Sequence, residues 1–158
     1  MSEPGGAHLI SIVEQADLGD LLVLVRAYCD FYRVAPSDED LLELSRALIA
    51  DPEREGVQLI AREANGGGRA VGFATVFWSW ATTRGARIGI MHDLFVDPAA
   101  RGSGLADALI GRCLELCREH GARSLQWETA LDNLRAQGVY DRVGGVRERW
   151  LSYYLDVS

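Results

Sequence analysis

The residues best suited to chemistry form a short glycine-rich segment in the second half of the chain, Arg101-Gly102-Ser103-Gly104. It leads into Leu105 and Ala106, where an apolar spacing begins that predicts a helix ending near His120-Gly121. A helix start presents backbone N–H groups and the positive end of the helix dipole, and glycines let an anion approach them. Arginine adds paired hydrogen bonds to phosphate oxygens. The segment therefore predicts a phosphate site, although a plain turn at Asp97-Pro98 before a helix would use the same residues.

Two side chains that can exchange protons, His92 and Asp93, lie near the end of a predicted strand over residues 87–96. Imidazole titrates near neutral pH, so His92 is a candidate general base. Strict alternation puts His92 on the face of Ile88, which favours a core histidine equally, unless a bulge resets the strand. Asp93 and Glu128 are alternative bases or anchors for a cationic substrate. Their ordinary roles would be solvation at a strand end or pairing with arginine.

Aromatic and acidic side chains could line a pocket for such a substrate. Tyr28, Asp30 and Tyr32 lie toward the end of a predicted helix over residues 21–32, and Trp78 lies in a later strand. Aromatic faces with nearby acids suit an ammonium group. Core packing is the alternative role for most of these aromatic residues.

The elements that must position these residues follow from periodicity and turn signals. Predicted strands cover residues 8–13, 57–62, 70–80, 87–96, 125–130 and 150–157, and predicted helices cover 21–32, 38–50, 105–120 and 133–143. The glycine-rich turn at 65–68 makes the second and third strands a hairpin. This order of elements indicates one α/β domain, residues 1–158, with a mixed sheet flanked by helices.

Composition restricts what such a domain can do. Sixteen basic residues, all arginine, face twenty-three acidic ones, which gives a net charge of −7. Without lysine, neither a Schiff base nor a phosphate-loop lysine is available. The basic residues form no run, so no nucleic-acid partner is expected. The longest nearly uncharged stretch, Ala70–Thr83, is too short to span a membrane, so no membrane association is expected.

Cysteine use predicts a reducing compartment. Cys29, Cys113 and Cys117 cannot all pair within the chain, and the first residues lack the features of a signal peptide, so we expect a cytoplasmic protein. Cys113, Cys117 and His120 would share one helix face, as metal ligands do. The two cysteines also continue an apolar stripe and no fourth ligand is evident, so we expect no metal.

Two motifs give the chain a family resemblance. Residues 96–106 resemble the R/Q-x-x-G-x-G/A signature of the GNAT acetyltransferase superfamily, with Arg101, Gly104 and Ala106 at the signature positions. A second signature of that superfamily, N-x-x-A-x-x-x-Y-x-x-x-G, is similar to the segment that carries Asn133, Ala136, Tyr140 and Gly144. The resemblance implies a single-domain GNAT fold whose mostly antiparallel sheet is splayed between its fourth and fifth strands.

Within the superfamily, the chain looks closest to the diamine (polyamine) acetyltransferases and related amine acetyltransferases. The Glu-Asp-Phe-Phe-Val strand ending of those enzymes corresponds to residues 92–96, where His92 replaces the glutamate. Gly145 stands at a usually aromatic position, and the segment from Gly145 to Trp150 is shorter than in the diamine enzymes. These departures concern the acceptor amine and leave the cofactor motif unchanged.

The resemblance implies direct transfer of an acetyl group from acetyl-CoA to a primary amine of a small polyamine-like or amino-acid-derived molecule. It assigns residues 101–106 to the pyrophosphate and the backbone of Leu94, Phe95 and Val96 to pantetheine. Tyr140 would be the general acid beside the sulfur, with core packing as its alternative. Asn133 would orient the acetyl-CoA arm, or simply cap the short helix. The first two helices would border the acceptor site, which favours Tyr28, Asp30 and Tyr32.

The resemblance also implies a homodimer. Two other functions stay open at this point. The enzyme could acetylate protein lysines or N-termini, which would call for an open groove in place of a closed acidic pocket. Alternatively, the domain could bind acyl-CoA as a sensor without turnover.

Overall fold

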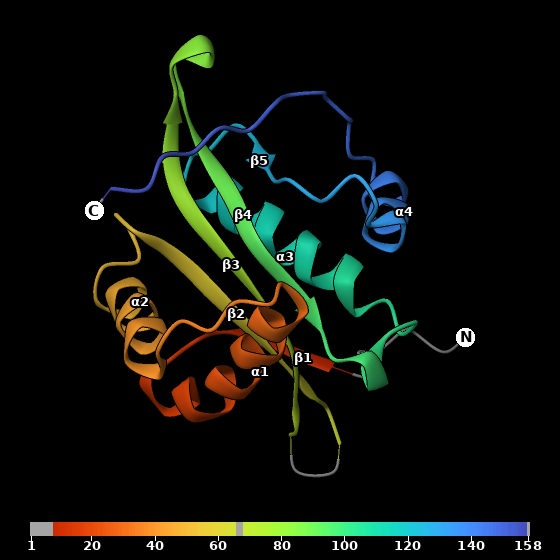
Figure 1. Cartoon of the computed structure of the whole chain (residues 1–158). Helices are drawn as coiled ribbons and strands as arrows, with labels where there is room; N and C mark the ends of the chain where they lie inside the picture. Colours follow the sequence, from red (N-terminus) through yellow and green to blue (C-terminus); the bar gives the residue numbers. More distant parts are fainter. Residues whose placement is uncertain (1–7, 66–67, 158) are drawn as a thin grey trace. The chain divides into compact units, whose positions relative to one another are not determined.

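The computed structural model describes residues 8–65 and 68–157 (Figure 1). Two predictions concern residues outside these ranges. They are the absence of signal-peptide features in the first six residues and the hairpin turn at its central glycines, Gly66 and Gly67. The elements in chain order are β1 (His8–Ile12), α1 (Leu18–Phe31), α2 (Asp38–Ala50), β2 (Gly56–Glu63), β3 (Ala70–Ala81), β4 (Ala86–Val96), α3 (Leu105–Glu119), β5 (Leu125–Gln126) and α4 (Leu134–Arg142).

The strands form one sheet in the order β1-β2-β3-β4-β5, in which the first four strands are antiparallel to their neighbours. β5 is parallel to β4 and pairs with it only at Gly89 and Ile90. Beyond Ile90, β4 pairs with no other described strand on that side as far as Val96. The predicted mixed sheet, open between its fourth and fifth strands, is therefore confirmed.

The chain divides into two compact units, Met1–Glu128 and Thr129–Ser158. The first holds the whole sheet with α1, α2 and α3, and the second holds α4 and the segment that follows it. No helix in the described ranges, 8–65 and 68–157, is both long and apolar enough to cross a membrane.

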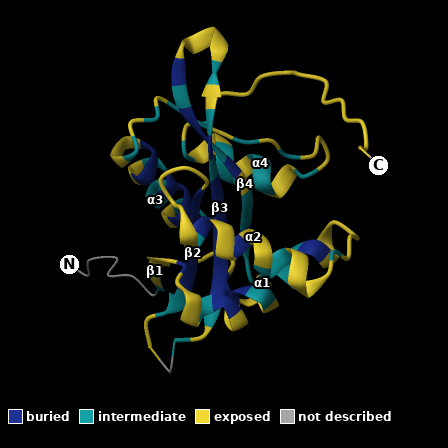
Figure 2. Ribbon diagram, turned by 90° about the vertical axis from the view of Figure 1, so that its left-hand side faces the viewer, coloured by how far each residue is buried: buried dark blue, intermediate teal, exposed yellow. Residues whose placement is uncertain are grey.

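Within the first unit, α1 and α3 cover opposite faces of the sheet (Figure 1). Neighbouring residues of a strand point to opposite faces. The ring of Phe73 meets Tyr28 of α1, whereas a Cβ built on the adjacent Gly72 would meet Leu105 of α3 at 3.3 Å. Figure 2 shows that burial is concentrated in the central strands β2 and β3.

α3 packs so closely on the sheet that one strand position requires glycine. A Cβ on Gly89 would lie 2.6 Å from Sγ of Cys117, well inside van der Waals contact. Cys113 and Cys117 are fully buried on this face, where their apolar stripe was predicted to pack. His120, at the end of α3, stacks on the ring of Trp78 with the centroids 3.9 Å apart.

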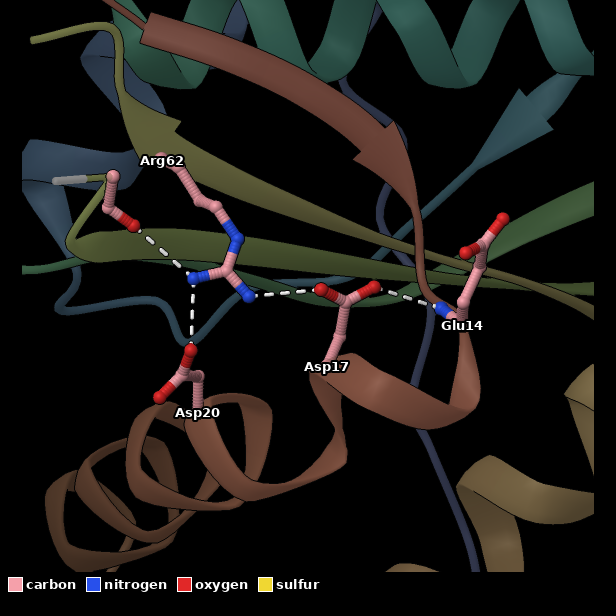
Figure 3. Close-up of polar contacts among 5 residues, drawn as sticks. Glu14, Asp17, Asp20 and Arg62 are labelled. Carbon is pink, nitrogen blue, oxygen red and sulfur yellow. Dashed lines mark hydrogen bonds and ion pairs between the residues drawn. The ribbon is translucent and has the colours of Figure 1, made fainter.

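α1 is fixed to the sheet by a group of charged residues that we call the Arg62 cluster: Glu14, Asp17, Asp20 and Arg62 (Figure 3). The Arg62 guanidinium lies 2.8 Å from a carboxylate oxygen of Asp17 and 2.8 Å from one of Asp20. The backbone N–H of Glu14 donates to Asp17 at 2.9 Å. Burial alone would raise the pKa of Asp17, but the Glu14 N–H and Arg62 together hold that pKa below its usual value. These contacts explain why α1 begins at Leu18, earlier than predicted.

Two predicted strands are corrected by the structure. Residues 150–157 form no strand, and their large side chains are exposed (Figure 2). Strand preference reflects packing against cross-strand neighbours, and no described strand pairs with this segment. β5 covers only Leu125–Gln126 of the predicted 125–130, because its one neighbour, β4, meets it only at Gly89 and Ile90.

Candidate active site

A bulge in β4 exposes His92. Asp93 pairs with Thr75 of β3 and Met91 pairs with Val76, so His92 is an extra residue opposite no β3 partner. A bulge of this kind changes the direction of a side chain and interrupts the alternation. His92 is exposed, and its ring centroid lies 5.4 Å from that of Phe77. The core-histidine alternative is therefore wrong, and the imidazole is accessible at the surface.

Tyr28 of α1 lies over this bulge. Its hydroxyl donates a hydrogen bond to the backbone carbonyl of His92 at 3.3 Å. Its ring packs edge-on against Phe73 and Phe95 and against Tyr32, with centroid distances of 5.6, 6.4 and 5.0 Å. Burial, followed by the charge of Asp93, raises the pKa of Tyr28, so the phenol stays protonated and serves as a donor.

Asp93 lies beside the same bulge and is partly buried. Burial raises the pKa of its carboxyl, against the opposing effects of a hydrogen bond from Thr75, the charge of His92 and a hydrogen bond from Tyr28. A carboxylate with a raised pKa is a stronger proton acceptor than an exposed one. Asp93 therefore has the environment of a general base, and His92 stands next to it at the surface.

The other predicted acceptor residues do not all gather here. Tyr32 is 48% exposed and stacks edge-on with Tyr28, and Asp30 is exposed near the end of α1. Trp78 lies on the α3 side of the sheet, the face opposite Asp93, where it stacks on His120 and donates its indole N–H to the Pro52 carbonyl at 2.9 Å. Its role in the structure is packing.

Glu128 is the last residue of the first unit. It is exposed and follows β5, which ends two residues earlier at Gln126.

The glycine turn, residues 101–104, follows β4 after a short 3-10 turn over Pro98–Ala100 and leads into α3. Gly102 and Gly104 have φ values of 79° and 80°, which favour glycine, and a Cβ on either would meet nothing within 4 Å. The Ser103 hydroxyl donates to the Ala100 carbonyl at 2.5 Å, and Arg101 Nε donates to the Val96 carbonyl at 3.2 Å. The turn is therefore tied to the end of β4 and open above its glycines.

The start of α3 has the features of an anion site. Gly104 provides no side-chain cap in the described structure, and the Ala108 N–H makes the first helical hydrogen bond, to the Gly104 carbonyl at 3.1 Å. The backbone N–H groups of Leu105 and Ala106 precede that bond, where a helix start attracts negative charge. Leu105 itself is buried against the sheet and fixes the helix start in place.

The residues of the second motif lie in the second unit, on and before α4. The Asn133 side-chain oxygen accepts the Ala136 N–H at 3.2 Å, which is the capping role considered as its alternative. Tyr140 is half-buried on α4, and its carbonyl accepts the Gly145 N–H at 2.9 Å. The role of Tyr140 as an acid stays a prediction.

Two residues in line with Asp93 across the sheet were missed by the sequence analysis. Thr75 and Gln58 are buried polar residues in otherwise apolar strands, and they are joined by a hydrogen bond of 3.2 Å. The signal was present, because each is two positions from an apolar residue of the α1 face, Phe73 and Ile60 respectively. A polar residue on a buried face needs a partner.

Comparison with known proteins agrees with this arrangement. The model of the acetyltransferase (GNAT) family matches residues 22–145. YhfO, an uncharacterised N-acetyltransferase of Bacillus subtilis (strain 168), is 27% identical over 139 residues, covering 88% of this chain and 90% of YhfO. Thialysine N-epsilon-acetyltransferase of Bos taurus is 26% identical over 145 residues, covering 86% of this chain and 82% of that enzyme.

One solved structure shows the likeness of the fold. AAC(6')-Iy, in complex with the bisubstrate analog CoA-S-monomethyl-acetylneamine, has a TM-score of 0.80 at 18% identity, covering 97% of this chain and 100% of that one. At this identity the likeness concerns the fold alone. Together with the family match over residues 22–145, these findings show that the chain belongs to the acetyltransferase (GNAT) family and is an N-acetyltransferase.

Proposed function

We propose that this enzyme transfers an acetyl group from acetyl-CoA to a primary amine of a small cationic molecule. The observation that carries the proposal is that β4 leads from a proton-accepting bulge, His92 and Asp93, into a glycine turn that can hold an anion. One strand thus brings together the two requirements of acetyl transfer to an amine, a base and a site for the cofactor phosphates.

The first unit offers a binding site for acetyl-CoA. The pyrophosphate would contact residues 101–106, where Arg101 and the backbone N–H groups of α3 supply donors. Pantetheine would pair with the edge of β4 at Leu94, Phe95 and Val96, which no other described strand occupies on that side. Positive φ at Gly102 and Gly104 and the open space above them agree with a bound phosphate. No metal takes part in this proposal.

The residues of the chain would divide the proton transfers between them. Asp93 takes a proton from the ammonium group, directly or through water, because the amine attacks only in its neutral form. The amine nitrogen then bonds to the thioester carbon, whose oxygen is polarised by backbone N–H groups of β4. As the carbon–sulfur bond breaks, Tyr140 gives a proton to the sulfur, and the second proton released by the amine nitrogen returns to Tyr140 through water. His92 stands by Asp93 as the alternative base.

The acceptor class follows from the surroundings of the bulge. Tyr28 and Tyr32 offer aromatic faces, Asp93 offers negative charge, and the net charge of −7 favours the approach of a cation. Asp30, exposed near the end of α1, is a candidate anchor. Glu128 is a further candidate anchor. The similarity to a thialysine acetyltransferase supports a small amine of this kind.

A thiol-release assay across acceptors tests the proposal. With acetyl-CoA held constant, the panel contains thialysine, lysine, spermidine, neamine and two peptides, one with an internal lysine and one with a free N-terminal alanine. We expect release with at least one small amine, at a higher kcat/KM than with either peptide. Higher values for the peptides would favour the protein-acetylating alternative. If no acceptor releases thiol while acetyl-CoA raises the melting temperature, the sensor reading replaces ours.

The variant Tyr140→Phe tests the acid. We expect kcat to fall about 10- to 100-fold, since proton transfer by a placed side chain is worth about 10²- to 10⁴-fold and water can partly replace it. The Kd for acetyl-CoA, measured by calorimetry, should stay unchanged. Tyr153→Phe, in the exposed C-terminal segment, is the matched control. Unchanged turnover in Tyr140→Phe would remove the acid role from this residue.

We further propose that residues 1–158 work as one domain, as a homodimer in the cytoplasm. Residues of both units carry the signatures of a single family, which supports the first part. Sedimentation equilibrium tests the assembly, and a monomer at micromolar concentration would contradict it.

A further inference from the structure

We propose that Thr75, held in place by Gln58, is a positioning residue that orients the Asp93 carboxyl and stabilises its charged form. The inference rests on the proposed function, in which Asp93 is the base. Neither Thr75 nor Gln58 belongs to a signature of the family resemblance, and both are enclosed beneath the surface that a substrate would reach. They would act on the reaction only through Asp93.

The three residues form a row across three strands. Gln58 of β2 is paired with Thr75 of β3, and Thr75 is paired with Asp93 of β4. The row lies on the α1 face, next to the apolar row of Ile60, Phe73 and Phe95. Directly paired side chains on one face of a sheet lie within contact distance. Each member therefore has the next one as its immediate neighbour.

One hydrogen bond gives this row a direction. Gln58 Nε2 donates to Thr75 Oγ1 at 3.2 Å, and the two side chains are 4% and 0% exposed. Because the threonine oxygen accepts from one side, its own hydrogen is free to point to the other side. There lies Asp93, the strand partner of Thr75, and a hydrogen bond from the Thr75 hydroxyl would favour the charged form of its carboxyl group. The row thus presents a fixed donor to the carboxylate.

An unpartnered atom shows how the row would adapt to a protonated Asp93. Gln58 Oε1 is buried without a hydrogen-bond partner among the described residues, which native structures seldom allow. When Asp93 carries a proton, its O–H can donate to Thr75 Oγ1. The threonine hydrogen then turns toward Gln58, whose amide rotates to present Oε1. Only rotations are needed, and both states of Asp93 keep a partner.

Other groups near Asp93 act independently of this row. From α1, the Tyr28 hydroxyl favours the charged carboxyl, and the charge of Asp93 adds to burial in raising the pKa of the Cys29 thiol; from β4 the neighbouring His92 also favours the charged form. Burial raises the pKa of Asp93, and the Thr75 hydrogen bond opposes that rise. Loss of the hydroxyl should therefore move the Asp93 titration to higher pH.

Carboxyl ¹³C NMR of the full chain without substrate measures this titration directly, with the Asp93 signal assigned by its absence in Asp93→Asn. We expect Thr75→Val to raise the Asp93 pKa and Thr75→Ser to restore it. Thr83→Val, at an exposed threonine in the β3–β4 turn, should leave it unchanged. A circular dichroism melt checks that each variant is folded. An unshifted Asp93 signal in folded Thr75→Val would overturn the proposal.

A double-mutant cycle tests whether Gln58 acts through Thr75. We expect Gln58→Leu to raise the Asp93 pKa by less than Thr75→Val does, and to have no effect when Thr75 is already valine. An equal effect in both backgrounds would overturn the row as a unit. Thr75→Ala, which also removes the hydroxyl and is expected to raise the Asp93 pKa, covers the case in which Thr75→Val does not fold.

The same variants separate this inference from the proposed function. If Asp93 is the base, the acidic limb of the kcat/KM profile, measured with the best amine of the panel, should move to higher pH together with the NMR titration. A shift in the titration with a stationary limb would support the row and contradict Asp93 as the base. A stationary titration would contradict the row whatever the activity shows.

Discussion

Two polar sites lie on the α1 face of the sheet, on either side of the apolar row Ile60, Phe73 and Phe95, and they are built in opposite ways. In the Arg62 cluster, Asp17 and Asp20 near the start of α1 each lie 2.8 Å from the Arg62 guanidinium. In the row of Gln58, Thr75 and Asp93, one ionisable group is partly buried and one buried oxygen has no partner in the described structure. Each site includes one residue of β2, and these two residues, Gln58 and Arg62, are only four positions apart.

The difference separates stability from chemistry. Paired charges at a partly exposed position lower the free energy of the folded state when their attraction outweighs the cost of desolvation. A partly buried carboxyl with a raised pKa opposes folding once it ionises, and such groups are found where a proton must move. Mutations at the first site should therefore change stability and spare activity, and mutations at the second should do the reverse.

The largest effect is expected from Asp93→Asn. Turnover in the thiol-release assay should fall about 10²- to 10⁴-fold, the usual contribution of a general base. The melting temperature at pH 7 should stay the same or rise. Because the folded-state pKa lies above the unfolded one, the carboxyl contributes stability at low pH that is lost as pH rises through the folded pKa. If Asp93→Asn turned over as fast as the wild type, the row of Gln58, Thr75 and Asp93 would not be the site of chemistry.

Arg62→Met should produce the largest loss of stability. It removes the partner of both Asp17 and Asp20 and keeps an apolar stem, so we expect a loss of about 1–2 kcal/mol. For a chain of this size that corresponds to about 2–8 °C in melting temperature. The value of kcat well below the melting temperature should be unchanged. A drop in kcat without a drop in melting temperature would contradict the division.

A smaller effect is expected from Asp17→Asn during acid unfolding. The ionised Asp17 should contribute about 1 kcal/mol or less to the free energy of unfolding. Its pKa in the folded state is depressed, so its contribution is present above the unfolded value of about 3.9 and is lost as pH falls through the folded pKa. Between pH 4 and pH 2, Asp17→Asn should therefore lose less stability than the wild type does. Urea midpoints across that range measure this, and parallel curves would rule the linkage out.

The smallest effect is expected at an exposed ion pair. Arg46 and Glu39 of α2 lie 3.0 Å apart with side chains 46% and 76% exposed. Solvent screens such a pair, so Arg46→Met should change the free energy of unfolding by less than about 0.5 kcal/mol. This variant is the matched control for Arg62→Met. A loss as large as that of Arg62→Met would mean that partial burial does not explain the Arg62 cluster.

Local patterns predicted those parts of the molecule that neighbouring residues determine. The predicted bounds of the helix over 38–50 match the observed ones, because the Ser37 hydroxyl caps this helix by accepting a hydrogen bond from the Asp40 N–H. The central strands were placed within one or two residues, since their apolar runs end at turn residues. The glycine turn before α3 was located for the same reason.

Contacts between distant segments could not be predicted from such patterns. The bulge that exposes His92 depends on the pairing of β4 with β3, and alternation along one strand does not reveal where an extra residue is placed. Gln58 and Thr75 become partners only when β2 and β3 are aligned. The prediction of a strand over residues 150–157 was wrong, because aromatic composition favours a strand but a strand also needs a neighbouring strand to pair with.

The burial of the thiols has a practical consequence. Cys29, Cys113 and Cys117 are all buried, and burial raises the pKa of Cys113 to about 12 and that of Cys117 to about 11. Thiolates are the nucleophiles that attack a disulfide reagent, so the folded enzyme should react with such a reagent very little. An aromatic disulfide reagent can therefore measure the coenzyme A thiol released during catalysis without interference from the protein. After denaturant is added, the same reagent measures the three cysteine thiols of the unfolded chain.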